Sequence, residues 1–122
     1  MTLRLLIALL VLLLPGHAAR AAQLELLMFE QPGCVYCARW NAEIAPEYPL
    51  TAEGQLAPLR RIDLRAPLPD GITIEAHPLF TPTFVLVSDG VETGRLEGYP
   101  GEDFFWPILA SMLRQAGAGI AD

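Results

Sequence analysis

The chain has 122 residues and a formal net charge of −6, and it contains no lysine. Its length is enough for one small domain with a modest core. Its acidity leaves no positively charged surface that would attract nucleic acid or anionic lipid, so neither is expected as a partner.

Residues 1–21 have the three-part layout of a secretory signal peptide. A short positive start, "MTLR", precedes an apolar run from Leu5 to Leu14, and "ARA" at 19–21 resembles a signal-peptidase site. The alternative is an uncleaved membrane anchor. A helix of this run would cover roughly half of a ~30 Å hydrocarbon core, so cleavage after Ala21 is favoured. We therefore predict an exported protein whose mature part, residues 22–122, is a single domain.

The next elements follow in chain order. Residues 24–29, "LELLMF", are apolar at most positions, as expected of a central strand with helices on both sides. From Cys34 the spacing changes to that of a helix, whose apolar stripe runs from Cys37 to Tyr48 and which two prolines bend or end. Residues 59–64, "LRRIDL", alternate and predict a second strand. Residues 65–80 hold three prolines and a glycine, which leaves open a further helix or a short extended piece.

The second half of the chain predicts a hairpin and a helix. Residues 83–88, "TFVLVS", indicate a buried strand, "DG" at 89–90 is a hairpin turn signal, and 91–99 form the return strand. An amphipathic helix closes the domain, and its apolar stripe is predicted to consist of Phe104, Ile108, Leu109, Met112 and Leu113. This order predicts an α/β fold with one mixed four-stranded sheet and helices on both of its faces.

The only two cysteines, Cys34 and Cys37, lie at the predicted start of the first helix. A disulfide between them closes so short a loop that it adds little to stability, so a chemical role is favoured. The amides and dipole at a helix N-terminus stabilise a thiolate, so the pKa of Cys34 is expected to be lowered. Cys37, one turn further on the buried stripe, would stay a thiol and attack second. Thiol–disulfide exchange requires this asymmetry.

Other uses of a Cys-x-x-Cys pair fit less well. Structural zinc needs four ligands, and after export only His77 is available besides the two cysteines. Covalent haem attachment needs a histidine directly after the second cysteine, where the chain has Ala38. Two thiolates can bind Cu(I), so a metal-carrier module stays open as an alternative, as does an inert disulfide.

Several motifs together resemble the thioredoxin superfamily. They are "PGCVYC" after a strand, "TPT" at 81–83 directly before a strand, the "DG" turn, and "GY" at 98–99. The resemblance covers nearly all of residues 23–116. It implies a thioredoxin-like fold and a thiol–disulfide oxidoreductase, with the Cys34–Cys37 disulfide as its redox group and no metal or other cofactor.

The same resemblance implies roles for single residues. Cys34 is the attacking cysteine and Cys37 the resolving one. Pro82 matches a cis-proline that faces the pair, and it would turn the backbone of Thr81 toward an extended substrate segment. Tyr36, between the cysteines, either presents its ring to a partner or packs on its own helix. A reductase is the preferred interpretation, with an oxidase or isomerase of the same fold as the alternative.

One departure from the family pattern concerns the proton of the resolving cysteine. In thioredoxin a buried acid on the first strand helps to move that proton. Here Met28 stands near that position, and Glu30 is the nearest acid. The proton route to Cys37 is therefore not defined by the resemblance.

A closer resemblance covers the run from Met28 to Leu64 together with residues 81–106. Both look like the small exported thioredoxins encoded with bacterial sulfur-oxidation (Sox) genes. This implies a periplasmic monomer that reduces a cysteine on a Sox carrier protein, with electrons from a membrane thiol transporter.

Overall fold

The computed structural model of the chain describes residue 16 and residues 19–121. The predicted signal peptide, residues 1–21, lies almost wholly outside the described residues and stays a prediction. In the described part of the chain, no helix combines the length and the apolar character needed to cross a membrane.

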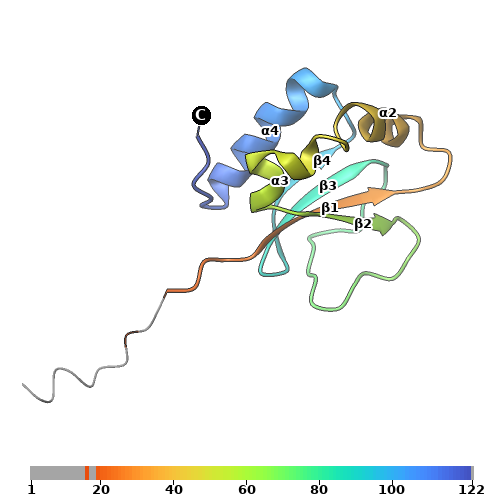
Figure 1. Ribbon diagram of the computed structural model, residues 1–122. Coiled ribbons are helices and arrows are strands. Elements are labelled where there is room, and N and C mark those ends of the chain that lie inside the picture. The colour runs from red at the N-terminus through yellow and green to blue at the C-terminus, as the bar shows by residue number, and fades with distance from the viewer. Residues whose placement is uncertain (1–15, 17–18, 122) are drawn as a thin grey trace, which may run out of the picture.

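A four-stranded mixed sheet in the order β2-β1-β3-β4 forms the centre of the molecule (Figure 1). β1 (Leu24–Glu30) pairs in parallel with β2 (Leu59–Asp63) and antiparallel with β3 (Thr83–Ser88). β3 pairs antiparallel with β4 (Val91–Glu97). β1 is apolar at most positions because it lies between two strands and is covered on both faces. The predicted α/β class with a mixed four-stranded sheet is confirmed.

The β3–β4 hairpin turns at Asp89 and Gly90, as the "DG" signal predicted. Both residues have positive φ, 48° and 83° respectively, which is the conformation that such a turn needs. At Gly90 space is limiting as well, since a Cβ there would lie 2.1 Å from the carbonyl oxygen of Gly71. The turn is therefore held against the segment that precedes β3.

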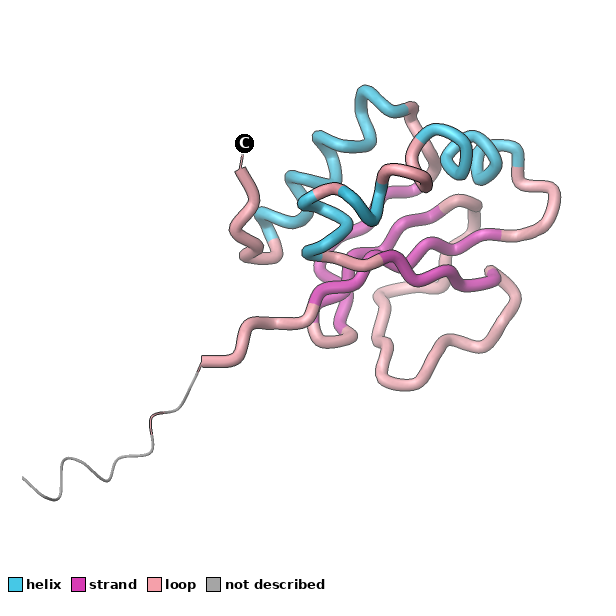
Figure 2. The backbone as a smooth tube through the Cα atoms, in the orientation of Figure 1, coloured by secondary structure: helices cyan, strands magenta, loops and turns pink. Residues whose placement is uncertain are grey.

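The helices cover one face of the sheet (Figure 2). They are α2 (Val35–Glu43), the 3₁₀ turn η1 (Tyr48–Leu50), α3 (Ala52–Leu56) and α4 (Glu102–Gln115). α3 was not predicted, because five residues are too few for a helical period to show. Its one sequence signal is Thr51, whose hydroxyl oxygen accepts the Gly54 N–H at 3.0 Å as an N-cap.

The opposite face of the sheet carries no helix among the described residues, so the expectation of helices on both faces was wrong. The loop after β2 lies there instead (Figure 1). Its apolar side chains Leu64, Leu68, Ile72 and Ile74 pack on a cluster of strand residues, namely Leu27, Phe29, Ile62, Val85 and Val87. The physical reason lies in the prolines and the glycine of residues 65–80. The prolines lack the N–H that a helix needs for its hydrogen bonds, and the glycine loses more conformational entropy than other residues when a helix forms. The extended interpretation of this segment is confirmed at Thr73, which forms a parallel bridge with Val91.

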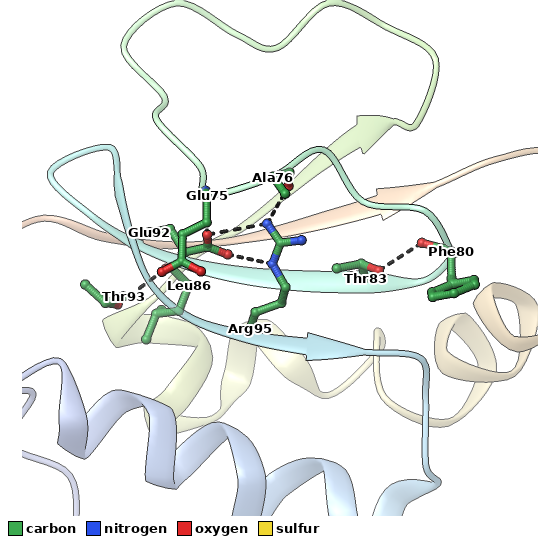
Figure 3. Close-up of polar contacts among 8 residues, drawn as sticks. All are labelled: Glu75, Ala76, Phe80, Thr83, Leu86, Glu92, Thr93 and Arg95. Carbon is green, nitrogen blue, oxygen red and sulfur yellow. Dashed lines mark hydrogen bonds and ion pairs between the residues drawn. The ribbon is translucent and has the colours of Figure 1, made fainter.

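Polar contacts fasten this loop to β4 (Figure 3). The Arg95 guanidinium pairs with Glu92 at 2.6 Å and donates to the carbonyl oxygen of Ala76 at 2.6 Å. The second Glu92 oxygen accepts the Glu75 N–H at 2.8 Å. The Glu92 side chain is almost fully buried, so this ion pair is shielded from water and holds the loop firmly against the sheet.

The closing helix α4 packs on the sheet through a stripe that differs from the predicted one at its start. Phe105 is buried, whereas Phe104, which was predicted to be in the core, is 63% exposed. The buried residues of α4 are Phe105, Leu109, Met112 and Leu113. Their spacing follows the helical period, and Phe104 falls outside it. The Phe105 ring lies edge-on to the rings of Trp40 and Phe84.

Candidate active site

The two cysteines form a disulfide at the point where β1 has ended and α2 begins. Cys34 is the N-cap of α2, and its Sγ accepts the Cys37 N–H at 3.1 Å. An amide that donates to sulfur at a helix N-terminus would stabilise a negative charge on Cys34 once the disulfide is reduced. Cys34 is partly exposed, whereas Cys37 is only 4% exposed. The order of reactivity expected from the sequence agrees with this geometry.

The loop before β3 lies beside the cysteine pair. Its Thr81–Pro82 peptide bond is cis. The Gln31 side-chain amide, in the turn before Cys34, donates to the Thr81 hydroxyl at 3.0 Å. On its other side, the carbonyl oxygen of Pro82 accepts the Gly98 N–H at 2.7 Å. The fold thus brings Thr81 and Pro82, which the sequence singled out, to the active-site turn.

Large apolar side chains are exposed in both of these segments. Val35 and Tyr36, between the cysteines, are 70% and 55% exposed. Leu79 and Phe80, just before Thr81, are also exposed. Of the two expectations for Tyr36, the structure favours a ring that faces solvent.

A pocket of about 680 Å³ opens beside the disulfide. Its walls come from the active-site turn, from α2 and from the ends of β1 and β2. Cys37 lines this pocket, together with Asn41 one turn further along α2. Polar side chains from the sheet, Glu30, Arg61 and Asp63, form its other side. The pocket is therefore an opening, with polar side chains on one side, toward a cysteine that is otherwise buried.

A comparison with solved structures agrees with this geometry. The chain is 66% identical to the periplasmic thioredoxin SoxS from Paracoccus pantotrophus, whose crystal structure is of the reduced form. The two structures superpose with a TM-score of 0.75, and the match covers 76% of this chain and 98% of that one. The chain belongs to the SoxS family of periplasmic thioredoxins. A scan against protein-family models and a search of curated proteins found no match.

Membership of this family confirms the predicted thiol–disulfide oxidoreductase. The Cys34–Cys37 pair is the redox group that a thioredoxin uses, and it stands in this chain at the start of a helix. The family to which the chain belongs does not favour the metal-carrier alternative.

The alternative in which the chain binds a metal ion can also be compared with the positions of the possible ligands. Within residues 19–121, no group of three or more His, Cys, Asp or Glu side chains is placed to hold a metal ion. His77, the third residue considered for zinc, contacts the Phe29 ring edge-on, and its Nε2 lies 2.7 Å from the carbonyl oxygen of Leu64. Phe29 belongs to the cluster on the face opposite the helices, so His77 is separated from the cysteine pair by the sheet.

The first-strand position that holds an acid in thioredoxin is apolar in this family member. Met28 is fully buried in the core cluster that also contains Cys37 and Trp40. The nearest cation is Arg61, whose Nη1 lies 3.8 Å from the Met28 sulfur. The structure therefore has an apolar side chain at the first-strand position where thioredoxin has an acid, as expected from the sequence.

Sequence reasoning missed a polar cluster that joins α2 to the loop after β4. The Tyr99 hydroxyl donates to the Glu43 carboxylate at 2.5 Å, and the Arg39 guanidinium lies 5.8 Å from the centre of the Tyr99 ring. The hydrogen bond from Tyr99, together with the charge of Arg39, lowers the pKa of Glu43. Burial and the neighbouring carboxylate raise the pKa of Tyr99. The Arg39 guanidinium also pairs with the Glu43 carboxylate at 3.4 Å.

Proposed function

We propose that this thioredoxin is a reductase that acts on a protein disulfide or a blocked cysteine, with Cys34 as the attacking and Cys37 as the resolving residue. The observation that carries the proposal is the difference between the two sulfurs. Cys34 is partly exposed and receives an N–H at the helix N-terminus, whereas Cys37 is buried behind it. Only the first sulfur is placed to reach a partner molecule.

The reaction balances in two exchange steps. The Cys34 thiolate attacks one sulfur of the partner disulfide, forms a mixed disulfide and releases the other partner sulfur as a thiolate. Cys37 then loses its proton and attacks the Sγ of Cys34. The Cys34–Cys37 bond forms, and the second partner sulfur leaves with the electron pair of the broken bond. The partner gains two electrons, and this protein ends as the disulfide seen in the structure.

Thr81, Pro82 and Tyr36 are proposed to bind the substrate segment around its cysteine. The Gln31–Thr81 hydrogen bond supports this proposal, because it fastens the loop before β3 next to the turn that bears Cys34. The exposed rings of Tyr36 and Phe80 give the same region apolar area that a partner could cover. An extended segment with an apolar residue next to its cysteine fits this surface.

The family supports a proposal for the partner and for the location. The SoxS relative is periplasmic, and the first 21 residues of this chain have the layout of a signal peptide. We therefore propose export to the periplasm, a cysteine-bearing carrier protein of sulfur oxidation as substrate, and a membrane thiol transporter as electron donor. The protein is proposed to act as a monomer.

Trapping of mixed disulfides tests the assignment of the two cysteines. Cys37→Ser should accumulate a mixed disulfide between Cys34 and its partner, because the resolving thiol is missing. Non-reducing gels of periplasmic extracts, followed by mass spectrometry of the shifted band, measure this. The matched control is Cys34→Ser, which should trap no partner. Equal trapping by Cys34→Ser would reverse the two roles.

A further inference from the structure

The buried position of Cys37 raises the question of where its proton goes. A thiol has to become a thiolate before it can attack a disulfide. Cys37 is 4% exposed, and Met28, which belongs to the same core cluster, has no group that takes a proton. Any acceptor must therefore reach Cys37 from another side.

The pocket beside the disulfide gives an approach to Cys37 on which polar side chains are present. It is lined by Cys37 itself and by the carboxylates of Glu30 and Asp63. Its volume of about 680 Å³ is large enough for several water molecules, and the polar side chains among its lining residues supply hydrogen-bond partners. Water in this pocket can connect the thiol to a carboxylate.

Glu30 lies on the face of β1 that points toward α2. Side chains alternate along a strand, so Glu30 is on the same face as Met28, two residues nearer to the end where the disulfide lies. Its carboxylate is held by Arg61 of β2, at 2.6 Å. The same guanidinium donates to the side-chain oxygen of Asn41, at 2.9 Å.

Asn41 connects this ion pair to the turn of α2 that carries Cys37. It is four residues after Cys37, so the two side chains lie one above the other on the helix. Arg61 also lies over the Trp40 ring, with 5.7 Å between Cζ and the ring centre. These contacts hold the guanidinium, and with it the Glu30 carboxylate, at the pocket that Cys37 also lines. Asp63 is exposed and accepts the Arg65 N–H at 2.7 Å, so it is directed to its own loop.

We propose that Glu30 is the proton acceptor for Cys37, acting through water in the pocket, and that Arg61 is a positioning residue for the Glu30 carboxylate. The inference rests on the proposed function, in which Cys37 resolves the mixed disulfide. The Cys37 thiol passes its proton to the Glu30 carboxylate, and the resulting thiolate attacks the Sγ of Cys34. The partner sulfur leaves as a thiolate with the electron pair and takes up a proton from the protonated Glu30 or from solvent. Glu30 thereby takes the role of the acid that thioredoxin has near the position of Met28, and it does so from two residues further along the same strand.

Stopped-flow reaction of the reduced protein with dithiobis(nitrobenzoate) separates the two steps. The first nitrothiobenzoate is released when Cys34 attacks the reagent, and the second is released when Cys37 resolves the mixed disulfide. In Glu30→Gln we expect the second release to be slower by about tenfold or more near neutral pH, within the range of general base catalysis. The first release should be unchanged. The difference should shrink at alkaline pH, because there solvent hydroxide ionises the thiol without an acceptor.

Glu25→Gln is the matched control. Glu25 lies on the same strand, pairs with Arg60 at 3.8 Å and is 33% exposed, against 30% for Glu30. It is on the opposite face of the sheet, so its loss should leave both releases unchanged. Arg61→Gln should also slow the second release, since Glu30 would lose its anchor. Circular dichroism establishes that each variant is folded.

Three outcomes would overturn the inference. The second release could be as fast in Glu30→Gln as in the unmodified protein, it could be slowed equally by Glu25→Gln, or it could depend on Asp63→Asn instead. Failure of the proposed function is distinguishable from these. It would show as the absence of a fast first release from Cys34 in every variant, whereas failure of the inference leaves that release intact.

Discussion

Cys34 and Cys37 are one helical turn apart, yet the fold exposes them to different surroundings. Cys34 caps α2 and receives an N–H at its sulfur, and Cys37 belongs to the apolar core under the same helix. A thiolate gains from the first environment and loses from the second. The order in which the two thiols react therefore follows from their places on one helix, before any partner is considered.

Two glycines allow a prediction at the residue scale. Gly90 and Gly98 both have positive φ, 83° and 85°, but a Cβ would lie 2.1 Å from a backbone oxygen at Gly90 and would meet nothing within 4 Å at Gly98. Gly98→Ala should cost about 1–2 kcal/mol of the free energy of unfolding, from backbone strain alone. Gly90→Ala should cost clearly more, because the β3–β4 turn must also move away from Gly71. Urea unfolding of the two variants measures this, and equal losses would contradict the clash.

In helix α4, two phenylalanines that are adjacent in the sequence point in different directions, and only one of them lies in the core. Phe104 and Phe105 are neighbours in sequence, but Phe105 is 1% exposed and Phe104 63% exposed. Phe105 contacts Trp40, Phe84, Tyr99 and Trp106. The aromatic cluster that α4 shares with α2 and β3 is therefore centred on Phe105.

This difference leads to a prediction at the scale of the element. Phe105→Ala should lower the free energy of unfolding by about 3–5 kcal/mol, since it leaves a cavity among packed rings. Phe104→Ala should change it by less than about 0.5 kcal/mol, because the ring is on the surface. Thermal or denaturant unfolding of the two variants provides the measurement. A large loss from Phe104→Ala would mean that the helix is rotated relative to the structure.

The molecule as a whole has two unlike faces. Helices cover one face of the sheet, and a proline-containing loop covers the other (Figure 1). The disulfide, its pocket and the cis Thr81–Pro82 bond gather at one end of the sheet, where β1 ends and β3 begins. This end carries exposed apolar side chains in both of the segments that are proposed to bind a partner. The rest of the acidic chain provides a scaffold for that end.

The direction of electron flow is a property of the whole molecule, because it depends on how strongly the folded protein stabilises its reduced form. For a reductase we expect a reduction potential below about −200 mV. Equilibration of the full mature chain with glutathione buffers, with the thiol state read by alkylation and mass spectrometry, measures it. A value near about −120 mV would indicate an oxidase and contradict the proposed direction.

Much of the fold could be predicted from local patterns. The four strands, the first and last helices and the Asp89–Gly90 turn each have a clear period or turn signal, and each was predicted in its place in the chain. The ends were less exact, since α2 ends at Glu43, before Tyr48, and β4 ends at Glu97. The short helix α3 was missed because it is held by a cap and by packing and not by a pattern of its own. The segment of residues 65–80 stayed undecided, since its two possible states differ in packing against the sheet and not in local preference.

Local signals in the sequence indicated a mixed sheet and a cysteine pair at a helix start, and the resemblance to thioredoxins implied the thioredoxin-like fold and the redox role of the pair. Which acids line the pocket beside Cys37 depends on the tertiary structure. Glu30, Arg61 and Asn41 come from β1, β2 and α2, and they meet only because β2 pairs in parallel with β1 under the helix. The tertiary structure also decided that a loop and not a helix covers the second face. Both outcomes depend on contacts between residues far apart in the chain, which no local pattern records.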